Sequence, residues 1–304
     1  MNNYDIAIIG AGAAGLTAAI YACRNNKSVV VFEGHVPGGQ ISESPLVENY
    51  PSIQEISGMD LSMNLLSHAE KNGAKLEYEN IKELKYDTEA RLITDSGKEF
   101  NAKAVIVAVG CAPRLIGLED ENDWLGRGLG YCAVCDGNFY KGLDVAVVGG
   151  GDSALQEAIY LSSICKSVSI IHRRDEFRAD AFMVDKAKKK DNIHYEWNSV
   201  VKRLEGQDKL EKVMLEDTIT HEERELSVKG LFVAIGRIPK TNLFRDWLNL
   251  DKGGFIIADE YCRTEHPWLF VAGDCRQKNL RQLATAVSDG AVAGVEASEF
   301  VDNI

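Results

Sequence analysis

One pattern occurs twice in this chain, and it limits the folds available more than any other feature. Residues 5–33 read DIAIIGAGAAGLTAAIYACRNNKSVVVFE and residues 144–172 read DVAVVGGGDSALQEAIYLSSICKSVSIIH, and the two align without a gap. In each copy an apolar run rich in Ile and Val leads to a glycine-rich turn, apolar residues at helical spacing and a second apolar run. This order predicts a strand, a helix and a second strand, so the chain should be an α/β protein with two Rossmann-like βαβ units.

The glycine-rich turns have the spacing of dinucleotide-binding sites. In such a turn the first glycine permits a tight bend, the second lets the backbone approach a pyrophosphate, and the third small residue lets helix and strand pack closely. A single turn of this kind is weak evidence, but two copies in register favour two nucleotide sites at helix N-termini. The expected contacts are Gly10, Gly12, Ala13, Ala14 and Gly15 in the first copy and Gly149, Gly150, Gly151, Asp152, Ser153 and Ala154 in the second.

The end of the second strand distinguishes the two nucleotides. Glu33 ends the first copy, and its carboxylate suits ribose hydroxyls and would repel a 2′-phosphate. His172 has this register in the second copy and is followed by three arginines, Arg173, Arg174 and Arg178. A solvated basic loop is the alternative interpretation, but guanidinium groups suit a phosphate monoester. We therefore assign FAD to the first copy and NADPH to the second.

A shorter repeat predicts where the two domains join. AKAVIVAVGCAPR at residues 102–114 and VKGLFVAIGRIPK at residues 228–240 each read as a strand that ends in glycine and then proline. The remaining segment, 242–304, is too short for a core of its own and should fold back onto the first domain. We expect an FAD domain made of residues 1–113 and 242–304, with an NADPH domain of residues 114–241 inserted into it.

A cysteine pair, Cys132 and Cys135, stands directly before Asp136 in the stretch CAVCDG. A structural zinc site would need two further ligands, and the six histidines are isolated from one another, so we expect no metal. A structural disulfide across so short a loop would stabilise little. The pair is best interpreted as a redox couple, because flavin is the usual intermediary between a hydride donor and a disulfide.

With these motifs in place, the chain resembles the low-molecular-weight thioredoxin reductases over essentially its whole length. The family's Cys-Ala-Thr-Cys-Asp signature is present as CAVCD, with Val134 in place of threonine. The dithiol also precedes the second βαβ unit, whereas glutathione reductase and its relatives carry theirs in the FAD domain. The other family motifs, in order, are GAGAAG (10–15), GGQ (38–40), VENYP (47–51), GGGDSALQEA (149–158), HRRDEFRA (172–179), FVAIG (232–236), AGD (272–274) and RQ (281–282).

The resemblance implies a route for the electrons. NADPH would reduce FAD, the flavin would open the Cys132–Cys135 disulfide, and the dithiol would reduce a protein disulfide, that of thioredoxin. Cys135 would face the flavin, Cys132 would attack the partner, and Asp136 would manage protons. The resemblance also implies a homodimer and a rotation of the NADPH domain during turnover. It adds cofactor contacts at Gly34, Gly39, Gln40, Asn49, Gly273, Asp274, Arg281 and Gln282 for FAD and at Ile235 and Gly236 for NADPH.

Charge and composition exclude some other classes of function. The net charge of −12 disfavours nucleic acid and acidic membranes as partners. Seven scattered cysteines and the lack of a signal-like N-terminus favour the cytoplasm.

Two alternative functions stay open. One is a reductase of another thioredoxin-fold carrier or peroxiredoxin system, and the other is a non-catalytic redox sensor that responds to nucleotide. Arg237, close to the expected nicotinamide, departs from the family's usual histidine or apolar residue.

Overall fold

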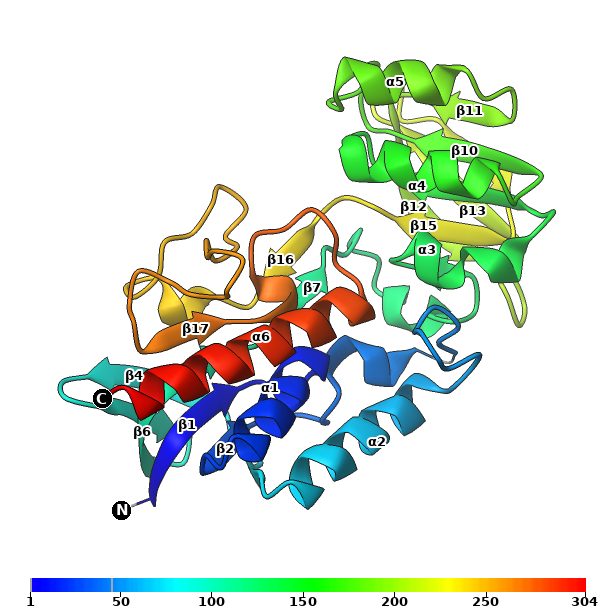
Figure 1. Ribbon diagram of the computed structural model, residues 1–304. Coiled ribbons are helices and arrows are strands. Elements are labelled where there is room, and N and C mark those ends of the chain that lie inside the picture. Colours follow the sequence, from blue (N-terminus) through cyan, green and yellow to red (C-terminus); the bar gives the residue numbers. More distant parts are fainter. Residues whose placement is uncertain (1, 45) are drawn as a thin grey trace. The chain divides into compact units, whose positions relative to one another are not determined.

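The computed structural model describes residues 2–44 and 46–304, which form two compact units (Figure 1). The first unit contains residues up to Ala112 and from Ile238 onward, and the second contains Pro113–Arg237. The limits predicted from the sequence lay at residues 113 and 242. The two crossing segments, β7 (Cys111–Pro113) and β16 (Arg237–Pro239), pair with each other as a two-stranded sheet.

The first unit is built on a seven-stranded sheet of order β3-β2-β1-β6-β5-β4, with β17 paired to β6. Its central strands are parallel, and β4 and β5 add an antiparallel hairpin at the edge. The sheet has a hydrophobic core on each face. Successive β1 residues belong to opposite cores, because side chains alternate between the two faces of a strand. The strands are β1 (Asn2–Ile9), β2 (Val29–Phe32), β3 (Lys75–Glu77), β4 (Ile81–Tyr86), β5 (Ala90–Thr94), β6 (Glu99–Val107) and β17 (Leu269–Val271).

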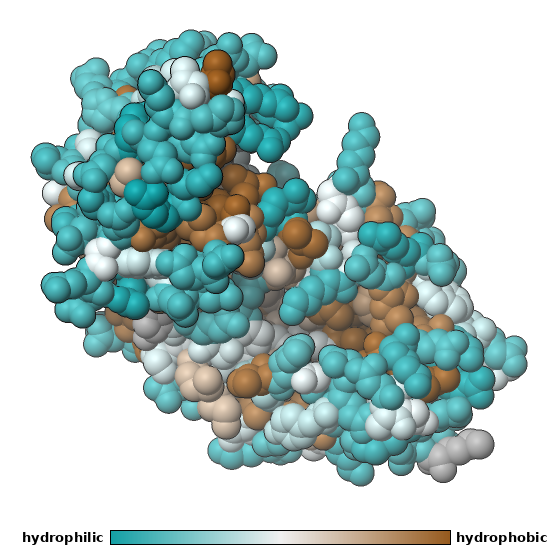
Figure 2. All heavy atoms as spheres, turned by 180° about the vertical axis from the view of Figure 1, so that it is seen from behind, coloured by the Kyte–Doolittle hydropathy of each residue, from teal (hydrophilic) through white to brown (hydrophobic). Residues whose placement is uncertain are grey.

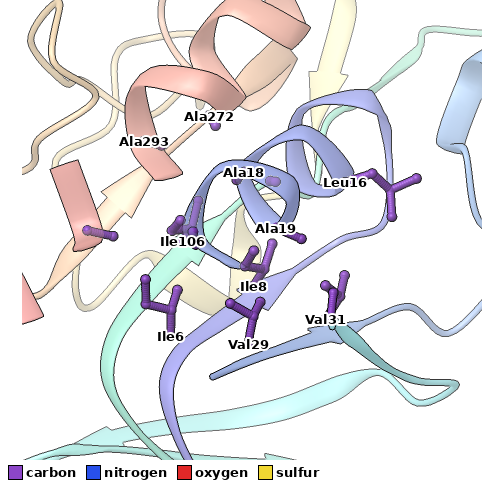
Figure 3. Close-up of a cluster of buried hydrophobic side chains, with 14 of the residues drawn as sticks. Ile6, Ile8, Leu16, Ala18, Ala19, Val29, Val31, Ile106, Ala272 and Ala293 are labelled. Carbon is purple, nitrogen blue, oxygen red and sulfur yellow. The ribbon is translucent and has the colours of Figure 1, made fainter. Parts of the chain in front are cut away.

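Three helices cover one face of this sheet, α1 (Ala13–Arg24), α2 (Gly58–Lys71) and α6 (Leu283–Asp302). Figure 3 shows Ile6, Ile8 and Ile106 of the sheet beneath α1 and α6. Two glycines of α6 allow its backbone to approach that of α1 closely. A Cβ at Gly290 would lie 2.2 Å from the Ala14 carbonyl oxygen, and one at Gly294 would lie 2.6 Å from the Ala18 oxygen. The short 3-10 helices of this unit are η1 (Gly39–Glu43), η4 (Asn242–Phe244) and η5 (Gly273–Cys275).

The second unit has a five-stranded parallel sheet of order β11-β10-β9-β15-β8. Helices pack on one face, and an antiparallel sheet of β12, β13 and β14 packs on the other. The strands are β8 (Leu129–Gly130), β9 (Asp144–Val148), β10 (Ser167–Ile171), β11 (Ile193–Glu196), β12 (Ser199–Glu205), β13 (Lys212–Asp217), β14 (Glu223–Ser227) and β15 (Gly230–Val233). The helices are α3 (Ala133–Asp136), α4 (Asp152–Ser162) and α5 (Ala181–Lys188), with 3-10 helices η2 (Glu121–Trp124) and η3 (Gly137–Tyr140).

These sheets confirm the predicted α/β class with two Rossmann-like units. In each unit, two parallel strands joined by a helix contain the nucleotide motif. Hydrophilic residues cover most of the face shown in Figure 2, with hydrophobic residues gathered in smaller patches. Within the part of the chain that the structure describes, no helix has the length and apolarity needed to cross a bilayer.

Candidate active site

The first glycine turn connects β1 to α1, and each of its three glycines is explained by a different feature of the geometry. Gly10 has a φ of +106°, and a Cβ there would lie 2.5 Å from the Ala108 carbonyl oxygen. A Cβ at Gly15 would lie 1.9 Å from the Gly10 oxygen, so this position fixes the helix against the turn. Gly12 differs, because a Cβ there would meet only the Gly38 oxygen at 3.9 Å. The open side of Gly12 and a helix start without a side-chain cap leave backbone N–H groups for a phosphate.

Glu33 follows β2 and supports the same turn. Its Oε2 accepts the N–H of Ala11 at 2.9 Å, and its Oε1 accepts the N–H of His35 at 3.1 Å. The side chain is only half-buried, and each carboxylate oxygen has a further lone pair. Glu33 can therefore accept hydrogen bonds from a ribose diol, as the FAD assignment requires.

The segment with Gly39 and Gln40 lies beside this turn. Gly38 pairs with Gly12 in a parallel bridge, and its N–H donates to the Ala11 carbonyl at 2.7 Å. Gly38 and Gly39 both have positive φ, +112° and +62°, which explains the double glycine. Gly34 lies directly after Glu33, and a Cβ there would lie 2.0 Å from the Asn80 side chain.

The C-terminal segment of the first unit brings further predicted FAD residues to the site. Asn49 Nδ2 donates to Gln282 Oε1 at 3.3 Å, so two residues far apart in sequence lie together. A Cβ at Gly273 would lie 2.8 Å from the Ala14 Cβ, which places η5 and Asp274 against the first turn of α1. Arg281 is held near this segment, because its Nε donates to the Asp274 carbonyl at 3.2 Å and its guanidinium lies 3.9 Å from the Phe255 ring centroid.

Asp289 organises this segment and was missed by the sequence analysis. It is buried on α6, and its Oδ2 accepts the Gly273 N–H at 3.0 Å and the Lys278 ammonium at 2.7 Å. Its Oδ1 accepts Arg276 Nη2 at 3.0 Å. The sequence contained one signal for this role. Asp289 is the single acid in the small-residue stretch LATAVSDGAVAG, and a role at the surface does not explain an acid at that position. One carboxylate therefore joins the start of α6 to η5.

The second glycine turn, between β9 and α4, repeats the logic of the first. Gly149 has a φ of +146°, and a Cβ there would lie 2.5 Å from the Ala234 carbonyl oxygen. A Cβ at Gly151 would meet nothing within 4 Å, and α4 begins there without a side-chain cap. Ala154, the third small residue, is fully buried. The turn thus presents open backbone to a pyrophosphate, as NADPH requires.

His172 is buried, whereas the three arginines that follow it are exposed. His172 is only 6% exposed, and a Cβ at Gly150 would lie 2.3 Å from its ring. Burial lowers the pKa of His172, and the neighbouring Arg174, Arg173 and Arg178 lower it further, so the imidazole is neutral. All three arginines are exposed, and the Arg178 N–H donates to the Gly150 carbonyl at 2.7 Å. His172 therefore lies beneath the glycine turn, and the arginines present the positive charge.

Other residues predicted near NADPH lie at the same edge of the sheet. Ser153 is exposed in the first turn of α4. Asp152 is also exposed there, and its Oδ1 accepts the Asp180 N–H at 2.8 Å. Ile235 and Gly236 follow β15, beside the Ala234 carbonyl that limits Gly149, and Gly236 has a φ of +113°. Residues from three strand ends therefore surround the second turn.

Cys132 and Cys135 form a disulfide in the second unit, with 5.3 Å between their Cα atoms. Cys132 is the N-cap of α3, and its Sγ accepts the Cys135 N–H at 3.2 Å. Both cysteines are half-buried, whereas Val134 between them is 45% exposed. The segment before them is fixed by Tyr131, whose hydroxyl donates to Glu121 at 2.6 Å. The geometry presents a disulfide near the surface on a short, well-anchored helix.

Asp136 lies directly after the disulfide and is half-buried. Burial raises the pKa of its carboxyl to about 6. A Cβ at Gly130 would lie 3.2 Å from Asp136 Oδ2, so the glycine makes room for this side chain. A carboxyl group with such a pKa can hold or release a proton near neutral pH, which suits a role in thiol chemistry.

Four of the other thiols are protonated near neutral pH. Burial raises the pKa of Cys23 and Cys165 to about 11 and that of Cys262 and Cys275 to about 12, which keeps these side chains protonated. Within residues 2–44 and 46–304, no group of three His, Cys, Asp or Glu side chains is arranged to hold a metal ion.

Known proteins are similar to this chain over nearly its whole length. A family model described as "Pyridine nucleotide-disulphide oxidoreductase" matches residues 4–290. The chain is 40% identical over 302 residues to a protein named thioredoxin reductase from Bacillus subtilis, covering 99% of this chain and 96% of that protein. It is 43% identical over 300 residues to one of the same name from Mycoplasma genitalium, covering 98% and 95%. The crystal structure of thioredoxin reductase from Streptococcus pyogenes superposes with a TM-score of 0.94 at 40% identity and covers 99% of each chain.

Proposed function

This chain belongs to the pyridine nucleotide-disulphide oxidoreductase family, and on that premise we propose that it is a thioredoxin-disulfide reductase. The resemblance predicted from the motifs is confirmed, and the enzyme is an oxidoreductase that acts on a disulfide with FAD and NADPH as cofactors. The observation that carries the proposal is the Cys132–Cys135 disulfide beside the half-buried carboxyl group of Asp136, in the unit that also carries the arginine-flanked glycine turn.

The two glycine turns would hold the two cofactors. In the first unit the open backbone at Gly12 would bind the FAD pyrophosphate, and Glu33 would bind the ribose. That site would be completed by Ala13, Ala14, Gly34, Gly39, Gln40, Asn49, Gly273, Asp274, Arg281 and Gln282. In the second unit Gly151 would face the NADPH pyrophosphate, and the exposed arginines would bind the 2′-phosphate. When bound, NADPH supplies a hydride and FAD passes its two electrons to a disulfide.

The chain's own chemistry is thiol–disulfide exchange. In the reduced enzyme the Cys132 thiolate attacks one sulfur of the partner's disulfide, and the partner's other sulfur leaves as a thiolate that takes up a proton. The Cys135 thiolate then attacks the Cys132 sulfur, which closes the disulfide and releases the partner's second thiolate, also to be protonated. Two electrons and two protons thus pass from the dithiol to the partner.

Asp136 can manage these protons. With a pKa of about 6, its carboxylate accepts a proton when a thiol ionises and returns it to a leaving thiolate. The apolar side chains of Val134 and Phe139, 45% and 46% exposed, lie close in sequence to the cysteines and suit a protein partner. We further propose a cytoplasmic homodimer that binds neither nucleic acid nor membranes, in keeping with the net charge of −12.

The test is NADPH oxidation by the purified FAD-loaded protein, with and without thioredoxin from the same source. We expect turnover that needs thioredoxin, prefers NADPH over NADH and is lost in Cys132→Ser. Cys23→Ser is the matched control and should keep full activity, because that thiol is protonated and lies on α1 of the other unit. If NADPH reduces the flavin but thioredoxin leaves the rate unchanged, the partner is another disulfide carrier or the protein is a sensor.

A further inference from the structure

Glu157 is an acid on α4 that packs against the helix with the two cysteines. Ala133, the residue after Cys132, is fully buried in the same hydrophobic cluster as α4, and its backbone N–H favours the ionised form of the Glu157 carboxylate. The two helices meet closely, because a Cβ at Gly137 would lie 3.0 Å from the Leu161 side chain of α4. Glu157 thus lies on the helix that packs against α3, near the first residue of α3 and the cysteine that caps it.

The second oxygen of Glu157 makes the group unusual. Oε2 is buried and accepts no hydrogen bond from the residues that the structure describes. Burial raises the pKa of Glu157 to about 7, with Arg237 lowering it and Asp136 raising it. A buried carboxylate oxygen without a donor is costly, so this carboxyl holds a proton over part of the neutral pH range.

We propose that Glu157 is a positioning residue of the dithiol, which anchors Cys132 through the Ala133 N–H and whose charge controls the ionisation of Asp136 and Cys132. The inference deepens the proposed function, because it gives the disulfide site a second carboxyl group. It is carried by the contact between α3 and α4 and by the buried oxygen.

The charges around Glu157 set the direction of its effect. Asp136 from α3 repels the ionised form and Arg237 attracts it, while Tyr140 from η3 is itself affected by Asp136. Two acids at close range do not ionise independently. When Glu157 is ionised, its charge opposes a negative charge on Asp136 and on the Cys132 sulfur. When Glu157 is protonated, both neighbours ionise more readily.

The experiment measures the ionisation of Cys132 directly in the full-length protein. The disulfide is reduced with dithiothreitol, the reductant is removed, and the rate of alkylation by iodoacetamide at Cys132 is followed by peptide mass spectrometry across pH. Glu157→Gln keeps an oxygen for the Ala133 N–H and removes the charge. Glu211→Gln is the matched control, because Glu211 is an exposed acid of the same unit. Melting temperatures show that each variant is folded.

We expect the alkylation midpoint of Glu157→Gln to fall by about one pH unit, the effect of one nearby charge on a pKa. Glu211→Gln should match the unchanged protein. In an Asp136→Asn background the Glu157→Gln shift should change in size, because the two acids are coupled. A Glu157→Gln profile that superimposes on that of the unchanged protein would overturn the inference. The assay needs neither NADPH nor thioredoxin, so its failure is distinct from a wrong partner.

Discussion

Replacing Asp289 should destabilise the first unit and weaken its hold on FAD. In Asp289→Ala the Arg276 and Lys278 side chains, 16% and 10% exposed, lose the carboxylate that balances their charge. Removing one partner of a buried ion pair costs about 3–5 kcal/mol. For a unit of this size each kcal/mol lowers the melting temperature by about 2–4 °C, so we expect a drop of roughly 6–20 °C. FAD binding should weaken as well, because the Gly273 N–H loses its acceptor beside α1.

The assay is differential scanning calorimetry of the FAD-free and FAD-loaded protein, with FAD dissociation followed by flavin fluorescence. Asp289→Asn keeps one acceptor oxygen without the charge and should fall between the alanine variant and the unchanged protein. Asp87→Asn makes the same chemical change at an exposed position of the same unit and should have no effect. An Asp289→Ala protein that melts within about 2 °C of the unchanged protein would refute the reasoning, because a buried charge pair cannot be lost at so small a cost.

Three further predictions concern the glycine turn, the dithiol acid and the arginines. Gly12→Ala should leave the melting temperature of the FAD-free protein unchanged but lower FAD affinity, whereas Gly15→Ala should lower that temperature, since its Cβ would lie 1.9 Å from the Gly10 oxygen. Asp136 has a pKa raised from 3.8 to about 6, so the folded state binds the proton more tightly and loses stability as pH rises from about 4 to 6. Urea titrations should therefore show Asp136→Asn gaining stability relative to the unchanged protein over that range, and parallel pH profiles would contradict this. Arg174→Ala should raise the KM for NADPH by roughly 10–100-fold, since a hydrogen bond to a charged group contributes about 1.5–3 kcal/mol. The KM for NADH should stay nearly unchanged. Equal effects on both KM values would mean that the 2′-phosphate binds elsewhere.

Local patterns were sufficient to predict the two βαβ units, because strand, turn and helix signals lie within a short stretch of chain. The glycine spacing predicted the conformations at Gly10 and Gly149, where positive φ and close backbone contacts exclude a side chain. The resemblance alone predicted that Asn49 and Gln282 both belong to the FAD site, and it did not predict that they pair. Their hydrogen bond depends on the fold that brings the two ends of the first unit together.

The residues missed by the sequence analysis are acids whose meaning depends on tertiary burial. Glu157 lies at helical spacing from Ala154 and Leu161, both buried, so its place on the packed face of α4 could have been noticed. Its contact with Ala133 could not, because no local pattern predicts that α3 docks on this face. Asp289 is similar, since a sequence does not show which cations will meet one carboxylate.

The end of the second strand shows how one register position acquires two different roles. Glu33 is half-buried, and its carboxylate reaches the Ala11 N–H within the first turn, which leaves it able to meet a ribose. His172 has the same register, but its ring is buried beneath Gly150 and is neutral, so it cannot contribute charge to a phosphate. We therefore expect the selection of NADPH to depend on the exposed arginines that follow. His172→Asn should lower stability, and Arg174→Ala should alter the choice of nucleotide, although the two residues are near neighbours in the chain.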